Sequence, residues 1–130
     1  MCIRDRNYSI PARNRLLDPS EVKEIKANYS EIRKRAQTTP GNQARLNLRK
    51  ENAIDVPESE RLKEYQYRWN EGGSSFIGAF QDLLFNADSN ETAAEFVRDR
   101  IREIVHDPET AEKLCPDNVI GCKRLCVDSN

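Results

Sequence analysis

The residues best suited to carry chemistry in this sequence are two adjacent cations, Lys123 and Arg124, close to the carboxyl-terminal end. They lie in a run of β-branched and apolar residues, Val119 to Val127, that predicts a turn leading into a strand. Because side chains alternate along a strand, we expect the two cations to face opposite sides and to serve two different anionic targets. Composition alone does not separate this pair from ordinary surface charge.

Other residue types that often carry chemistry have simpler explanations here. The single histidine, His106, stands at the end of a predicted helix, where the helix dipole favours a cation; a catalytic base is the alternative. The glycines fit neither a G-x-G-x-x-G nor a P-loop pattern, so no phosphate cradle of either kind is predicted. The cysteines lack the paired spacing of zinc sites, and we expect thiols rather than a disulfide or metal. They are Cys2, Cys115, Cys122 and Cys126.

The charge balance argues against polyanionic partners. The chain holds 21 basic and 22 acidic residues, mixed along its length, so no field concentrates nucleic acid or an anionic membrane. A basic cluster, Arg33 to Arg35 with Arg45, Arg49 and Lys50, has no interleaved aromatic residue to stack bases. No apolar run approaches the roughly 20 residues that span a bilayer, and no secretory signal opens the chain. We therefore expect a cytoplasmic protein that binds neither nucleic acid nor membrane.

Several carboxylates and aromatic residues are expected to be structural. Carboxylates interleaved with Lys or Arg at helical spacing predict solvated ion pairs. These carboxylates are Glu58, Glu60, Glu64, Glu91, Glu95 and Glu103. One aromatic set is predicted to form core, or contact with a missing neighbour, rather than a ligand cage. It comprises Tyr65, Tyr67, Trp69, Phe76 and Phe80.

Helix signals dominate the first half of the chain. Asp18, Pro19 and Glu21 predict a capping box at the start of one helix that runs to about Ala36. A loop is expected from 42 to 56, and a second helix from Pro57 to the glycine pair at 72 and 73.

The second half predicts three more helices and a strand. The predicted starts are Ser74 or Ser75, then Asp88 with Glu91, then Asp107-Pro108 for a short helix ending near Cys115. The third helix carries the most apolar face, formed by Phe76, Ile77, Phe80, Leu83 and Leu84. The final strand has no expected partner within the sequence. The fold class is therefore mainly α, with four to five helices and one terminal strand, as suits an insert in a larger α/β protein.

Both ends suggest an incomplete protein. Residues 1–6 show no periodicity and match a hexapeptide that recurs in metagenomic translations, so we expect a non-native leader. The chain stops at Asn130 directly after a strand-like run, which favours truncation.

Several sequence blocks, in order, resemble the flavin-dependent Baeyer–Villiger monooxygenases. The resemblance covers nearly everything after Arg6. The blocks are Ile10 to Asn14, Leu17-Asp18-Pro19, Glu71-Gly72-Gly73, Asn90-Glu91, Ala94 to Val97, Arg100 to Val105, Asp107 to Leu114, and Gly121 to Asp128.

This resemblance implies a parent enzyme that uses FAD, NADPH and molecular oxygen to convert a ketone into an ester or lactone. Residues 7–115 would be a helical insert in the NADP-binding domain, and 116–130 the start of a strand re-entering that domain. Arg124 would correspond to the family's active-site arginine, which holds negative charge at the oxygen-carrying flavin and contacts the nicotinamide. Lys123 would lie near the 2′-phosphate of NADPH.

The family's glycine-rich loops and its F-x-G-x-x-x-H-x-x-x-W fingerprint are missing from the sequence. We therefore expect the isolated chain to be inactive and its partners to be the missing FAD and NADP domains of the same polypeptide. A hypothesis from another class is a free-standing helical module whose exposed aromatic face docks a partner.

Overall fold

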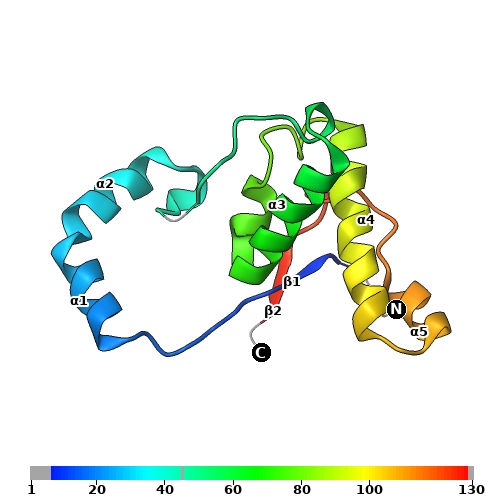
Figure 1. Ribbon diagram of the computed structural model, residues 1–130, viewed down its shortest axis with the longest axis horizontal. Helices are drawn as coiled ribbons and strands as arrows, with labels where there is room; N and C mark the ends of the chain where they lie inside the picture. Colours follow the sequence, from blue (N-terminus) through cyan, green and yellow to red (C-terminus); the bar gives the residue numbers. More distant parts are fainter. Residues whose placement is uncertain (1–6, 45, 129–130) are drawn as a thin grey trace.

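Residues 7–44 and 46–128 are described by the computed structural model, in which helices dominate and two short strands meet (Figure 1). The elements are β1 (Ser9–Pro11), α1 (Pro19–Ala27), α2 (Tyr29–Thr38), α3 (Glu58–Glu71), α4 (Ala87–Ile104), α5 (Pro108–Leu114) and β2 (Cys126–Asp128), with 3-10 helices η1 (Pro40–Asn42), η2 (Ala53–Asp55) and η3 (Gly73–Gly78). The predicted mainly helical class is confirmed. None of these helices is long and apolar enough to cross a bilayer. The predicted leader, residues 1–6, lies outside the described residues, as do Cys2 and Arg45.

The amino-terminal helical segment is two helices, α1 and α2, where one was predicted. Its start is confirmed, because Asp18 accepts from the Ser20 N–H and Glu21 closes the capping box. Its continuity is wrong, because the chain bends at Asn28, whose φ and ψ are -99° and 14°. The Asn28 side chain donates to Glu24 O at 3.1 Å, so it competes with the backbone for a helical carbonyl.

Helix α3 ends where glycine was predicted to end it. Gly72 has a φ of 76°, a conformation that L side chains rarely adopt, and a Cβ there would lie 2.3 Å from Pro11 O. The end of α3 therefore lies against the last residue of β1 and the two residues that follow it.

The predicted third α-helix is wrong, because residues 73–78 form the 3-10 helix η3, followed by turns. Neither Ser74 nor Ser75 caps it. The residue at the cap position is Gly72, which has no side chain to accept a hydrogen bond. The backbone here bonds to the preceding loop, since Arg49 N donates to Gly78 O at 3.1 Å and Gln81 N to Glu51 O at 3.2 Å. Those bonds replace the helical pattern.

An aromatic cluster forms the core between α3, η3 and α4. The Phe76 ring stacks on Phe96 with centroids 5.9 Å apart, and Tyr65 lies 5.6 Å from Phe76 and 5.5 Å from Phe96. Trp69 meets both phenylalanines edge-on. Edge and offset ring contacts of this kind stabilise beyond the area they bury. The prediction that the apolar face beginning at Phe76 anchors the core is confirmed for Phe76, Phe80 and Leu83, while Leu84 is about half exposed. Of the aromatic set, Tyr67 is about half exposed and the other four are buried.

Helices α4 and α5 begin with capping side chains. Asn86, rather than the predicted Asp88, caps α4 and accepts from Asp88 N at 2.9 Å. Asn86 was missed because Asp88 with Glu91 makes a stronger capping-box signature in sequence. The Asp107 cap of α5 is confirmed by its bond from Thr110 N at 2.8 Å.

The terminal strand does have a partner, so the expectation of a lone strand is wrong. β1 pairs with β2 in parallel, with Ser9 opposite Cys126 and Ile10 opposite Val127. Tyr8 and Ile10 are buried and Ser9 is exposed, as alternation along a strand requires. β1 is only three residues long, too short for its alternation to be visible in the sequence.

Candidate functional site

The two candidate cations follow a tight turn. Cys122 N donates to Val119 O at 3.2 Å, which closes a four-residue turn with Ile120 and Gly121 at its centre. Gly121 has a φ of 95°, which the third position of a type II turn requires and glycine supplies without strain. Lys123 and Arg124 come next and are both exposed.

Strand geometry does not set the directions of these two side chains. β2 begins at Cys126, after both cations, so the expected alternation to opposite faces does not apply to them. Lys123 instead forms an isolated bridge with Ile120, within the turn itself. Contact of the two cations with a cofactor stays a prediction.

Asn90, near the start of α4, hydrogen-bonds the backbone of this turn. Its Nδ2 donates to Ile120 O at 2.9 Å, and its Oδ1 accepts from Ile120 N at 2.9 Å. The same Nδ2 donates to Leu83 O at 2.7 Å. The side chain is buried, so these bonds are made away from water. A buried amide with its donors and acceptor satisfied in this way fixes its neighbours.

Tyr8 and Arg98 hold the residues before the turn. Tyr8 donates its hydroxyl to Asn118 O at 2.6 Å, and Arg98 Nε donates to Pro116 O at 3.0 Å. Arg98 Nη2 also donates to the Tyr8 hydroxyl oxygen at 3.3 Å. Burial raises the pKa of Tyr8, and the bond to Glu91 raises the pKa of Arg98. A phenol and a guanidinium are protonated at neutral pH in any case, and both shifts favour the protonated form further, so the bonds that they donate persist there.

The strand pair holds the chain after the cations. Cys126 N donates to Tyr8 O at 2.9 Å, and the Asn7 amide donates to Cys126 Sγ at 3.5 Å. Lys123 and Arg124 thus lie on a short exposed stretch with a fixed point on each side. Such a stretch can present two positive charges to a ligand outside this chain.

These anchoring residues were not identified from the sequence. In the sequence Asn90 was singled out only as part of a block that resembles the monooxygenases, and its burial could not be read from a polar residue type. Tyr8 lies in a strand too short to detect, and Arg98 has the pattern of a surface ion pair. The only signal in the sequence was that Tyr8, Asn90 and Arg98 are the kinds of residue that bond to backbone carbonyls.

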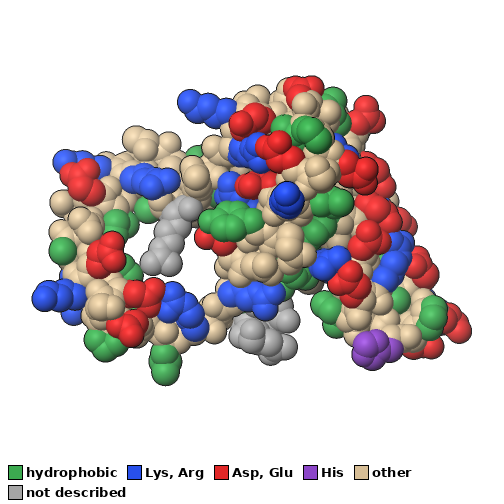
Figure 2. Space-filling view, in the orientation of Figure 1, with side chains coloured by type: hydrophobic (Ala, Val, Ile, Leu, Met, Phe, Trp, Pro, Cys, Tyr) green, Lys and Arg blue, Asp and Glu red, His purple; other side chains and the backbone are tan. Residues whose placement is uncertain are grey.

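The single histidine and the predicted ion pairs lie outside the turn. His106 is exposed and lines a hollow with Pro108 and Ala111. No group of three or more His, Cys, Asp or Glu side chains within 7–44 and 46–128 could hold a metal. The predicted solvated ion pairs are confirmed for Glu95 with Arg102 at 2.6 Å and for Glu103 with Arg100 at 2.5 Å. The prediction is wrong for Glu64, because its partner at 2.7 Å, Arg68, is buried. Figure 2 shows acidic and basic side chains interspersed over the visible face.

The basic cluster offered as a nucleic-acid site is partly neutralised. Arg49 pairs with Glu51 at 3.0 Å and with Glu60, and its guanidinium lies 5.1 Å from the centre of the Phe80 ring. Its positive charge is therefore used within the chain.

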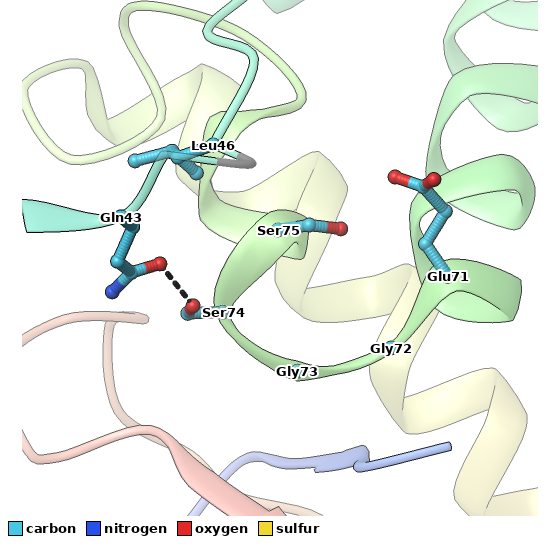
Figure 3. A pocket seen from close by; sticks show the side chains of 7 residues that line it. All are labelled: Gln43, Leu46, Glu71, Gly72, Gly73, Ser74 and Ser75. Atoms are coloured by element: carbon cyan, nitrogen blue, oxygen red, sulfur yellow. Dashed lines mark hydrogen bonds between the residues drawn. The ribbon is translucent and has the colours of Figure 1, made fainter. Parts of the chain in front are cut away.

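A hollow of about 260 Å³ lies beside the glycine pair that ends α3 (Figure 3). Ser74 donates its hydroxyl to Gln43 Oε1 across the mouth. Ser75 Oγ is buried without a hydrogen-bond partner, and its side chain points toward the side where Glu71 lies. Among the described residues that line the hollow none is a Lys or Arg, and the one charged side chain, Glu71, would repel an anion.

Comparison with known proteins gives relatives over nearly the whole chain, although no family model matches it. A phenazine N-monooxygenase of Lysobacter antibioticus is 32% identical and covers 96% of this chain and 23% of its own length. A Baeyer–Villiger monooxygenase of Pseudooceanicola batsensis, at 30% identity, and a cyclohexanone 1,2-monooxygenase of Acinetobacter, at 32%, each cover 95% of this chain and 23% of their own length.

Solved structures match equally well. A steroid monooxygenase bound to NADP superposes with a TM-score of 0.90 at 42% identity, over 97% of this chain and 24% of that one. An open cyclohexanone monooxygenase superposes with a TM-score of 0.90 at 37% identity, over 98% and 25%. The chain thus spans about a quarter of the length of the proteins it matches.

Proposed function

We propose, from the premise that this chain is similar over nearly its whole length to one segment of the Baeyer–Villiger monooxygenases, that it is that segment of an FAD- and NADPH-dependent enzyme. The parent would insert one oxygen atom from O₂ beside a ketone carbonyl and release an ester or lactone. The observation that carries the proposal is the TM-score of 0.90 at 42% identity with a steroid monooxygenase bound to NADP. We place the parent in the cytoplasm, where NADPH is available.

The domain assignment is part of the same proposal. Residues 7–115 would form a helical insert, and 116–130 would re-enter the NADP-binding domain. In support, β1 and β2 run parallel and are three residues long each. Parallel strands occur almost only in sheets covered on both faces, with helical connections between strands. A two-stranded parallel pair therefore suits the edge of a larger sheet better than a complete one.

Lys123 and Arg124 fit the chemistry of such a cofactor. Arg124 presents a guanidinium that stays charged and is planar, which suits negative charge developing in an active site and hydrogen bonding to a nicotinamide amide. Lys123 offers a compact charge for a 2′-phosphate. Reduced flavin, when bound, supplies the oxygen-activating chemistry. This chain's own contribution would be to hold the two cations at the cofactor on an anchored, exposed stretch.

The proposal is tested by recovering the longer reading frame from the source DNA and expressing its protein. We expect bound FAD, NADPH oxidation and lactone formation with cyclohexanone as probe. Replacement of Arg124 by Ala should lower lactone formation on the order of 100-fold, because a donor aimed at transition-state charge is lost. The matched control is Arg33→Ala, on the exposed surface of α2.

Two results would contradict the proposal. One is a longer protein that binds neither nucleotide; the other is an Arg124→Ala variant that forms lactone at the unaltered rate. The 130-residue chain alone should retain no yellow flavin and oxidise no NADPH, because the sequence holds no glycine-rich phosphate loop.

The alternative of a free-standing interaction module is less well supported. It required an exposed aromatic face, but Tyr65, Trp69, Phe76 and Phe80 are buried in the chain's own core. A thermal melt of the 130-residue chain discriminates further, because a self-sufficient module should unfold in one sharp transition.

A further inference from the structure

We infer that Asn90 is a positioning residue that sets where Lys123 and Arg124 stand, and through them the selectivity for a 2′-phosphorylated nicotinamide cofactor. This inference rests on the function proposed above and deepens it. Asn90 does not touch the cofactor in this account. It acts on the backbone of the turn that carries the two cations.

The bonds of Asn90 are concentrated on one residue of the turn. Its amide oxygen and nitrogen bond both backbone polar groups of Ile120, each at 2.9 Å. The exposed fraction is 3% for both Asn90 and Ile120. Removal of the side chain would therefore leave both polar groups of Ile120 without their protein partner, in a site away from bulk water.

The same amide also bonds the segment against which the turn packs. Asn90 Nδ2 donates to Leu83 O at 2.7 Å, and the neighbouring Leu84 side chain lies directly against Gly121. A Cβ on Gly121 would stand 2.7 Å from Leu84 Cδ2, so the glycine is in contact with that leucine as closely as its backbone permits. One side chain thus ties both the turn and the surface on which the turn lies.

The bonds of Asn90 to Ile120 are close enough in the chain to Lys123 and Arg124 to affect their positions. Cys122 N bonds Val119 O, so the turn behaves as one closed unit with Lys123 directly after it. On the far side, Cys126 N is fixed to Tyr8 O in the strand pair. Without Asn90 the chain keeps its fixed point after Arg124 and the bonds of Tyr8 and Arg98 to residues 116 and 118, but the turn itself loses both side-chain bonds to Ile120. The two charges would then sample several positions relative to a bound ligand.

Asn86 supplies a matched control. It is the same residue type, one helical turn earlier on α4, and its Oδ1 caps the helix by accepting from Asp88 N at 2.9 Å and Ser89 N at 3.3 Å. Replacing it by Ala should weaken the start of the same helix while leaving the Ile120 bonds in place. A second test variant, Asn90→Asp, keeps the shape and the acceptor for Ile120 N and loses both donated bonds. It keeps the test usable if Asn90→Ala folds poorly.

The experiment has two readouts. In the 130-residue chain, hydrogen exchange should speed up at the amides of 119–124 in Asn90→Ala and Asn90→Asp, compared with Asn86→Ala. In the protein from the longer reading frame, the ratio of kcat/KM with NADPH to kcat/KM with NADH should fall on the order of tenfold in the Asn90 variants, because a displaced charge no longer meets the 2′-phosphate. Asn86→Ala should leave the ratio unchanged, since loss of folded enzyme lowers both values equally.

The inference is overturned if the Asn90 variants match Asn86→Ala in either readout. A ratio that stays constant while exchange speeds up shows a structural residue only, which also overturns it. Failure of the proposed function is seen separately, in an unmutated longer protein that oxidises neither cofactor, and the inference then falls with it.

Discussion

Helices α1 and α4 both begin with a side-chain cap, but they differ in how much of the helix is buried. α1 opens with a complete capping box and buries none of its residues, and α2 buries none either. α4 opens on the Asn86 cap and buries Phe96, Val97 and both alanines at 93 and 94. Figure 1 shows α1 and α2 lying apart from α3 and α4. A cap therefore sets where a helix starts, whereas burial determines whether the stability of the rest of the fold depends on that helix.

The largest expected effect is on the buried core. Phe76→Ala removes a ring that is fully buried against Tyr65, Trp69 and Phe96, and should lower the free energy of unfolding by about 3–5 kcal/mol. Tyr29→Ala, in α2, removes an aromatic side chain that is 57% exposed and should change it by no more than about 0.5 kcal/mol. Urea titration followed by circular dichroism measures both. Equal losses would show that α2 is packed as tightly as the core.

A pH titration tests the burial of Tyr65, the phenol at the centre of the core. Burial raises its pKa from 10.0 to about 12, although the hydrogen bond to Thr92 opposes the rise. The folded state therefore keeps a proton that the unfolded chain loses. The resulting stability is complete below about pH 10 and is lost as pH rises toward about 12, on the order of 2–3 kcal/mol in all.

The control for this titration is Tyr65→Phe, which has no phenol to ionise. The urea midpoint of the unaltered chain should fall more steeply than that of the variant between about pH 10 and 12. Parallel curves would mean that Tyr65 ionises in the folded core as easily as in water.

The smallest expected effect compares the two caps directly. Asn86→Ala should lower the free energy of unfolding of the whole body by about 1 kcal/mol, because α4 packs on the core. Asp18→Ala should reduce the helical signal in far-ultraviolet circular dichroism and leave the urea midpoint in place, because α1 packs on nothing buried. If Asp18→Ala shifts the midpoint as far as Asn86→Ala does, α1 and α2 are coupled to the core after all.

Local signals were read correctly where the bonds that satisfy them are local. The Asp18 capping box, the Asp107 cap and the Gly72 helix end each involve residues within a few positions of one another. The apolar face around Phe76 and Phe80 was also identified, because large apolar side chains must be buried wherever the chain allows.

Two errors were local, at the Asn28 bend and the Asn86 cap. The others occurred where distant segments meet. The 3-10 helix η3 replaced a predicted α-helix because residues 49 and 51 bond to its backbone and to the turn after it. β1 was missed because its partner, β2, lies more than a hundred residues further along the chain. Asn90 was singled out only as part of a block that resembles the monooxygenases, although its side chain bonds Ile120, thirty residues away.

Sequence alone was enough to predict the starts of α1 and α5, the main apolar face, the similarity to a monooxygenase segment and the identity of the two cations. These depend on residue type and on spacing within a helical turn or two. Only the tertiary structure decided what holds Lys123 and Arg124 in place. Their anchors, Tyr8, Asn90 and Arg98, are remote in sequence, and a buried hydrogen bond between remote residues leaves no periodic trace in the chain.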